Sequence, residues 1–119
     1  MPIDRVLTWH LGESVQAGSS KGPVYRLDQD YRPKRATIYI KAAPAAADIV
    51  FDINVDDVSI FESSNRPRVT YGNKQVRVLN FNTERLVKDA IVTLDIDSIA
   101  DGTDITVSLE LEARPTDDE

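Results

Sequence analysis

The sequence predicts an all-β protein, an antiparallel two-sheet β-sandwich of about eight strands with a jelly-roll-like topology. Apolar and polar residues alternate with a period of two along most of the chain, and the helical period is almost absent. Turn-forming residues recur between the alternating segments at intervals of about ten residues. With 119 residues, of which 41% are apolar, the chain has the material for one hydrophobic core.

Four segments carry the clearest alternation: residues 5–11, 35–42, 48–55 and 104–112. Their core-facing residues are predicted to be Leu7, Trp9, Leu11, Ala36, Ile38, Ile40, Ala42, Ile49, Phe51, Ile53, Val55, Ile105, Val107, Leu109 and Leu111. The polar residues between them, including Asp48, Asp52 and Asn54, are expected to face solvent. One apolar face and one polar face are typical of antiparallel sheets, because parallel sheets are covered on both faces.

Shorter strands are expected at residues 24–27, 58–61, 68–71, 75–81 and 90–97. Turns are expected at residues 18–22, at Pro44, at Asp56-Asp57, at Pro67, at Gly72-Asn73 and at Asp101-Gly102. Residues 82–90 contain helix-forming residues after a possible cap at Asn82 or Thr83, but we favour a short loop there. We expect a single domain at 1–112, followed by an acidic, flexible C-terminal tail at 113–119.

The charge of the chain argues against nucleic acid and membrane partners. The net charge is −6, so the overall field opposes nucleic acid and anionic lipid. A local basic cluster at Arg32, Lys34 and Arg35 is expected to be a solvated loop that enters a strand. No apolar stretch is long enough to cross a bilayer, and the first residues lack the pattern of a signal peptide.

The residues of catalysis and metal binding are sparse. The chain has no cysteine, which excludes disulfides and thiolate ligands, and its one histidine, His10, cannot form a triad or a histidine cluster within one chain. The glycines of residues 12–22 lack the spacing of a phosphate-binding loop. No catalytic residue, cofactor or metal site is therefore predicted, and we do not expect an enzyme.

Two groups of aspartates are candidates for calcium ligands, because calcium prefers oxygen atoms. They are Asp52, Asp56 and Asp57 in one group and Asp95, Asp97, Asp101 and Asp104 in the other. Their spacing matches no EF-hand loop, and strand alternation and turn formation account for them. We expect them to be solvated surface residues.

Three stretches, residues 9–27, 36–61 and 90–112, resemble a β-sandwich domain of tailed-bacteriophage structural proteins, found in capsid decoration proteins, head fibres and tail fibres. The resembling features of the first half are a small-residue loop at 45–47, a strand at 48–55, a tight turn at Asp56-Asp57 and a Ser-Ile-Phe strand at 59–61. Those of the second half are the strand TLDID and a final strand that follows a glycine turn. The resemblance covers about residues 7–112. Asp57 departs from it, since glycine is more common at that turn position.

The resemblance implies a non-enzymatic virion structural protein, first of all a capsid decoration or cement protein that stabilises the head. It implies assembly in the host cytoplasm, exposure on the particle surface, and contacts with other phage structural proteins, chiefly the major capsid protein, or with further copies of the chain. The alternative is a tail-fibre or baseplate module that recognises host surface carbohydrate. That function needs an exposed aromatic platform, and aromatic residues make up only 7% of the chain.

Candidate interface residues follow from exposure and charge. The apolar candidates are Tyr39, Val50 and Tyr71, which alternation places outward or leaves unexplained, and the basic candidates are Arg66, Arg68, Lys74 and Arg77. Glu110 and Glu112 on the last strand, with the acidic tail, carry the opposite charge. Such a separation favours contact between copies, or contact with an oppositely charged shell surface.

Overall fold

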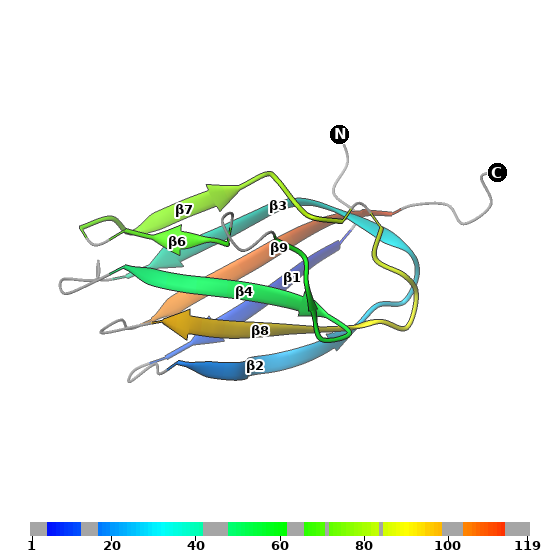
Figure 1. Cartoon of the computed structure of the whole chain (residues 1–119), viewed down its shortest axis with the longest axis horizontal. Helices are drawn as coiled ribbons and strands as arrows, with labels where there is room; N and C mark the ends of the chain where they lie inside the picture. Colours follow the sequence, from blue (N-terminus) through cyan, green and yellow to red (C-terminus); the bar gives the residue numbers. More distant parts are fainter. Residues whose placement is uncertain are drawn as a thin grey trace.

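The computed structural model describes residues 5–12, 17–41, 48–61, 66–70, 72–83, 85–98 and 104–113. These residues form strands and loops without a helix (Figure 1). The strands are β1 (Arg5–Leu11), β2 (Gly18–Arg26), β3 (Tyr31–Ile40), β4 (Ile49–Val55), β5 (Val58–Ser59), β6 (Arg68–Val69), β7 (Gln75–Val78), β8 (Ile91–Ser98) and β9 (Ile105–Ala113). The all-β prediction is confirmed. No helix among the described residues is long and apolar enough to cross a membrane.

The strands form two antiparallel sheets that pack face to face (Figure 1). The first sheet has the order β1-β9-β3-β7, and the second has the order β2-β8-β4-β5 with β6 also paired to β4. The chain crosses from one sheet to the other between β1 and β2, β2 and β3, β3 and β4, and β8 and β9, so both sheets enclose one core. Strand β9 is paired on both sides, with β1 and with β3.

The core consists of the inward-facing residues of both sheets, as period-two alternation requires. Trp9 and Phe51 are the largest fully buried side chains, contributed by the first and the second sheet respectively. Around them lie buried residues of β1, β3, β4, β8 and β9: Leu7, Ala36, Ile38, Ile40, Ile49, Ile53, Val92, Leu94, Ile96, Ile105, Val107, Leu109 and Leu111. Each fully buried aliphatic or phenyl side chain stabilises the fold by about 1.5–3 kcal/mol. Leu11 and Val55, predicted to be core residues, are only half-buried because they lie at strand ends.

Polar links between β1 and β2 close one side of the sandwich. The Trp9 indole Nε1 donates to the carbonyl oxygen of Pro23 at 2.7 Å, and the Tyr25 hydroxyl donates to the carbonyl oxygen of Thr8. The two rings meet edge to face with centroids 5.3 Å apart. At Gly22, where φ is +70°, a Cβ would lie 3.3 Å from Trp9 Cδ1, so glycine lets β2 approach the indole. These contacts cover the free edge of β1.

Two expectations about local structure were wrong. Residues 18–22 were expected to be a turn, but they belong to β2, which pairs with β8 through two register shifts that absorb the glycines. Residues 32–35 were expected to be a solvated loop, but they belong to β3 and pair with β9. Opposite charges on facing strands explain the second error, because Arg35 lies opposite Glu110, and Arg32 lies opposite Glu112.

Other expectations about turns and loops are confirmed. Asp56 and Asp57 form the turn between β4 and β5 with φ of 51° and 68°, the left-handed values of a hairpin turn that aspartate tolerates. The described part of residues 82–90 is a loop. Two backbone hydrogen bonds of 2.8 Å between Leu86 and Tyr31 hold this loop against β3. The buried carboxylate of Asp30 accepts from the Lys88 backbone at 2.8 Å in the same loop. Pro44 and Asp101-Gly102 lie outside the described residues.

The link between Tyr25 and β1 gives a test of the fold. We expect Tyr25→Phe to lower the free energy of unfolding by about 1 kcal/mol, because the Thr8 carbonyl loses its donor. Urea unfolding followed by the fluorescence of Trp9, the only tryptophan, measures the change. Tyr39→Phe is the matched control: Tyr39 is 48% exposed, and we expect a change within about 0.5 kcal/mol. Equal effects of the two substitutions would contradict the assignment.

Candidate functional site

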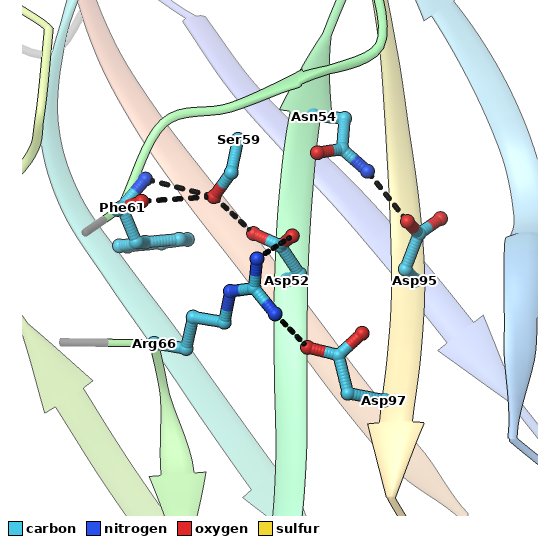
Figure 2. Close-up of polar contacts among 7 residues, drawn as sticks. All are labelled: Asp52, Asn54, Ser59, Phe61, Arg66, Asp95 and Asp97. Atoms are coloured by element: carbon cyan, nitrogen blue, oxygen red, sulfur yellow. Dashed lines mark hydrogen bonds and ion pairs between the residues drawn. The ribbon is translucent and has the colours of Figure 1, made fainter. Parts of the chain in front are cut away.

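A cluster of polar side chains covers the outer face of the second sheet (Figure 2). We call it the aspartate cluster; it consists of Asp52, Asn54, Ser59, Arg66, Asp95 and Asp97. Alternation along β4 and β8 places their polar residues outward, and the register sets Asp52 directly opposite Asp95. The cluster therefore depends on the pairing of two strands that are about forty residues apart in the sequence.

Asp52 is the buried member of the cluster, with only 4% of its surface exposed. The Ser59 hydroxyl donates to its Oδ1 at 2.5 Å, and the same hydroxyl accepts from the backbone N–H of Phe61 at 3.1 Å. Arg66 Nη2 lies 3.5 Å from the second oxygen of Asp52. Ser59 and Arg66 thus fasten the segments before and after residues 62–65 to the face of β4 (Figure 2).

The neighbouring carboxylates also have donors within the chain. Arg66 Nη1 pairs with Asp97 Oδ2 at 2.8 Å, so one guanidinium joins β4 to β8. Asp95 accepts from Asn54 Nδ2 at 2.5 Å and from the backbone N–H of Ser20 at 2.9 Å, which joins β8 to β2. Because these carboxylates are engaged by donors of the chain itself, the cluster is built to cross-link strands.

Burial raises the pKa of Asp52, since desolvation disfavours the charged carboxylate. The hydrogen bond from Ser59 and the charge of Arg66 act in the opposite direction, while Asp97 and Asp95 reinforce the rise. Desolvation is the largest of these influences, so the folded protein holds the Asp52 proton more tightly than an unfolded chain does.

The expectation that Asp52 faces solvent was wrong in one respect. Asp52 does lie on the outer face of β4, but Ser59, Arg66 and their adjoining segments cover it. Alternation predicts on which face of the sheet a strand residue lies, but it does not predict which other residues pack on that face. The signal in the sequence for this cover is Arg66, a long cation that follows a predicted strand and that is predicted to lie at an intermolecular contact.

Three of the calcium candidates, Asp52, Asp95 and Asp97, lie together in the aspartate cluster, but the part of the chain that is described holds no metal-binding group. No three histidine, cysteine, aspartate or glutamate side chains there gather as metal ligands. Asp56 has a local role, because its Oδ1 accepts from the Ile91 backbone N–H at 2.9 Å. Asp101 lies outside the described residues. His10 is exposed on β1, and its Nδ1 lies 2.9 Å from the Thr106 hydroxyl.

The described candidate interface residues belong to the two sheets near the side where β6 and β7 adjoin. Tyr39 is exposed on β3, with Lys74 and Arg77 exposed on or beside the neighbouring β7. On the second sheet, Val50 of β4 lies opposite Arg68 of β6 and is half-buried. Tyr71 lies outside the described residues.

The four basic interface candidates differ in whether they form ion pairs within the chain. Arg66 pairs with Asp52 and Asp97, and Arg68 pairs with Asp48 at 3.3 Å. Within the described residues, neither Lys74 nor Arg77 forms an ion pair. Free positive charge on this side is therefore concentrated at β7.

The proposed acidic counterpart on the last strand needs correction. Glu110 pairs with Arg35 at 2.5 Å, and Glu112 pairs with Arg32 at 2.6 Å and with Lys34 at 3.8 Å. The hydrogen bond from Arg32 lowers the pKa of Glu112, which keeps it ionised. Both glutamates lie on the central strand β9 and are neutralised within the chain, so their charge is not free for a partner.

Three surface depressions are lined by described residues. They measure about 250, 230 and 180 Å³, and they lie beside Arg32 and Leu79, beside Thr37 and Arg77, and beside Val58 and Asn82. Ligand pockets commonly measure about 300–1,000 Å³. These three depressions are therefore smaller than common small-molecule pockets.

Comparison with known proteins bears on the fold of the chain. No protein-family model and no curated protein matches the sequence. A chain from the capsid of Ralstonia phage GP4 matches with a TM-score of 0.58 and 15% identity, over 93% of this chain and 84% of that chain. The Tobacco streak virus coat protein matches with a TM-score of 0.36 and 11% identity, over 93% and 91% of the two chains, a score too low to support an argument. The phage match shows a common sandwich fold.

The pKa of Asp52 gives a test of the cluster. A raised pKa means that ionisation of Asp52 opposes folding, so its contribution to stability is greatest below the unfolded pKa of about 3.9 and is lost as the pH rises through the folded pKa. We therefore expect the unfolding free energy of the native protein, minus that of Asp52→Asn, to fall with rising pH. Urea titrations across a pH series measure this difference. A difference that increases with pH would mean that the Arg66 pair outweighs desolvation.

Proposed function

We propose that this chain is a non-enzymatic virion structural protein of the capsid decoration type, which binds the surface of an assembled phage head and stabilises it. The observation that carries the proposal is the match of the sandwich to a phage capsid chain over 93% of its length. The side chains of the aspartate cluster bind one another and cross-link strands of the chain. This structural use of the cluster agrees with a non-enzymatic function.

The mechanism of such a protein is interface formation repeated many times. Each bound copy adds its own binding free energy to the assembled shell, and a ligand that binds only the assembled state shifts the equilibrium away from rupture. The sandwich suits this task since its core is closed and its outer faces are fixed by cross-strand pairs such as Arg35–Glu110. A rigid surface loses little conformational entropy on binding.

We assign the contact surface to the side where β6 and β7 adjoin. It offers the exposed ring of Tyr39, the half-buried Val50 and the exposed cations Arg68, Lys74 and Arg77. Arg66 lies beside this surface but supports it from within, because both its ion pairs join β4 to β8. A basic surface on an acidic chain is directed towards an acidic partner surface.

The carbohydrate-binding alternative has less support from the surface. Sugars stack on exposed aromatic rings. Among the described residues, Tyr39 is the only exposed aromatic residue. Trp9, Phe51 and Phe61 are buried in the core. We therefore keep receptor binding as an outcome of the experiment below.

The test compares particles that carry the protein with particles from which it is stripped or omitted. We expect stripped particles to rupture at a lower temperature, or at a lower chelator concentration, and added protein to restore them. If rupture is unchanged while adsorption to host cells fails, the structural function is wrong and receptor binding replaces it.

A pair of matched variants tests the contact surface in the same assay. Arg68→Glu reverses a charge on the proposed surface, and Arg26→Glu reverses one on β2; these arginines are 56% and 69% exposed, and each pairs with one aspartate, Asp48 or Asp89. We expect added Arg68→Glu protein to protect particles less than native protein, and Arg26→Glu protein to protect them fully. Equal protection by both would contradict the assignment of this surface.

A further inference from the structure

Strand β7 leaves one edge of the first sheet open. Among the described residues it pairs only with β3, and in Figure 1 it lies at the upper margin of the molecule with no described strand beyond it. The backbone N–H of Ile40 donates to the Lys74 carbonyl at 2.7 Å, which fixes the register of the ladder. Since alternate residues of an antiparallel strand direct their backbone groups to opposite sides, Gln75 and Arg77 direct theirs away from β3.

The other sheet edges are obstructed. The Tyr25 hydroxyl occupies the Thr8 carbonyl on β1, and β2 contains Pro23 and two register shifts. Strands β5 and β6, which both pair with β4, have two residues each, too few to offer a ladder. Strand β7 is regular over its four pairs with β3, so it is the edge best formed for another strand.

The positive charge at the edge of β7 favours a negatively charged partner strand. Lys74 and Arg77 are exposed and form no ion pair with a described residue. Pairing of β7 with a second β7 would bring like charges together, which is unfavourable. A depression of about 230 Å³ beside the edge, lined by Thr37, Gln75, Val76 and Arg77, can receive side chains of an added strand.

The chain itself contains a segment of the complementary charge. Residues 114–119 have the sequence RPTDDE, in which Asp117, Asp118 and Glu119 are consecutive acids. They directly follow Ala113, where β9 ends opposite Tyr31. Thr116 to Glu119 contains four residues without proline, the length of β7.

This segment cannot lie along β7 of its own chain. Lys74 is paired with Ile40. Along β3, Ile40 lies about 30 Å from Tyr31, at roughly 3.3 Å per residue. Glu119 is six residues beyond Ala113, so it reaches at most about 20 Å from the end of β9. The acids therefore reach Lys74 and Arg77 together only from a second copy.

We propose that the acidic segment 114–119 of one copy adds as a strand to the free edge of β7 in a second copy, with its carboxylates beside Lys74 and Arg77. The contact joins two different surfaces, so it generates a ring of copies if the rotation closes. This inference deepens the proposed function, because it names a second copy as a partner of the contact side.

The experiment measures the mass of the protein alone in solution by sedimentation at increasing concentration. We expect the native protein to form an oligomer that high salt weakens, and Asp117→Lys/Asp118→Lys and Lys74→Glu/Arg77→Glu each to sediment as one chain. Combining the four substitutions exchanges the charges, and we expect the oligomer to return. Lys88→Glu is the control, since Lys88 is exposed and forms no ion pair with a described residue, and it should leave the oligomer intact.

Hydrogen exchange supplies a second readout that a general loss of stability would not reproduce. In the oligomer the amides of Gln75 and Arg77 should exchange more slowly than in the Asp117→Lys/Asp118→Lys variant. The amides of Val76 and Val78, which face β3, should be protected in both proteins.

Three results would overturn the inference: a native protein that sediments as one chain at every concentration, an oligomer that survives both double substitutions, or unchanged exchange at Gln75 and Arg77. A single-chain protein that still protects particles would overturn this inference alone. An oligomer that fails to protect particles would leave it standing and overturn the proposed function.

Discussion

The structure depends on one constraint, that each sheet has a single apolar face which only the other sheet can cover. Trp9 on the first sheet and Phe51 on the second are fully buried because the two faces meet. Burial of apolar surface is the main favourable contribution to folding, so polar residues are confined to the outer faces. The charged clusters and the exposed strand edge are consequences of this arrangement.

Much of the fold could be predicted because a single apolar face on each sheet requires apolar and polar residues to alternate along each strand. Leu109 and Ile53 were assigned to the core on that basis and are buried. Contacts between distant strands could not be predicted in this way. The pair Arg35–Glu110 spans 75 positions, and Asp52 is buried by residues that follow β4, so both depend on topology that alternation does not encode.

The same distinction applies to the candidate site. The sequence marked Arg66, Arg68, Lys74 and Arg77 as one basic group, and the structure separates them by their partners. Two are held by aspartates of the chain, and the two beside β7 form no ion pair with a described residue. Charge that is not needed for folding is available for recognition, and for this reason we propose the edge of β7 as a contact between copies.

The most direct measurement of the central claim is cryo-electron microscopy of the source particle, at a resolution that traces strands. The proposed function predicts density for the nine-stranded sandwich in many symmetry-related copies on the outer surface of the head, with the β6–β7 side in contact with the shell or with a neighbouring copy. Density for the sandwich only at the tail tip or in a fibre, with none on the head, would contradict it.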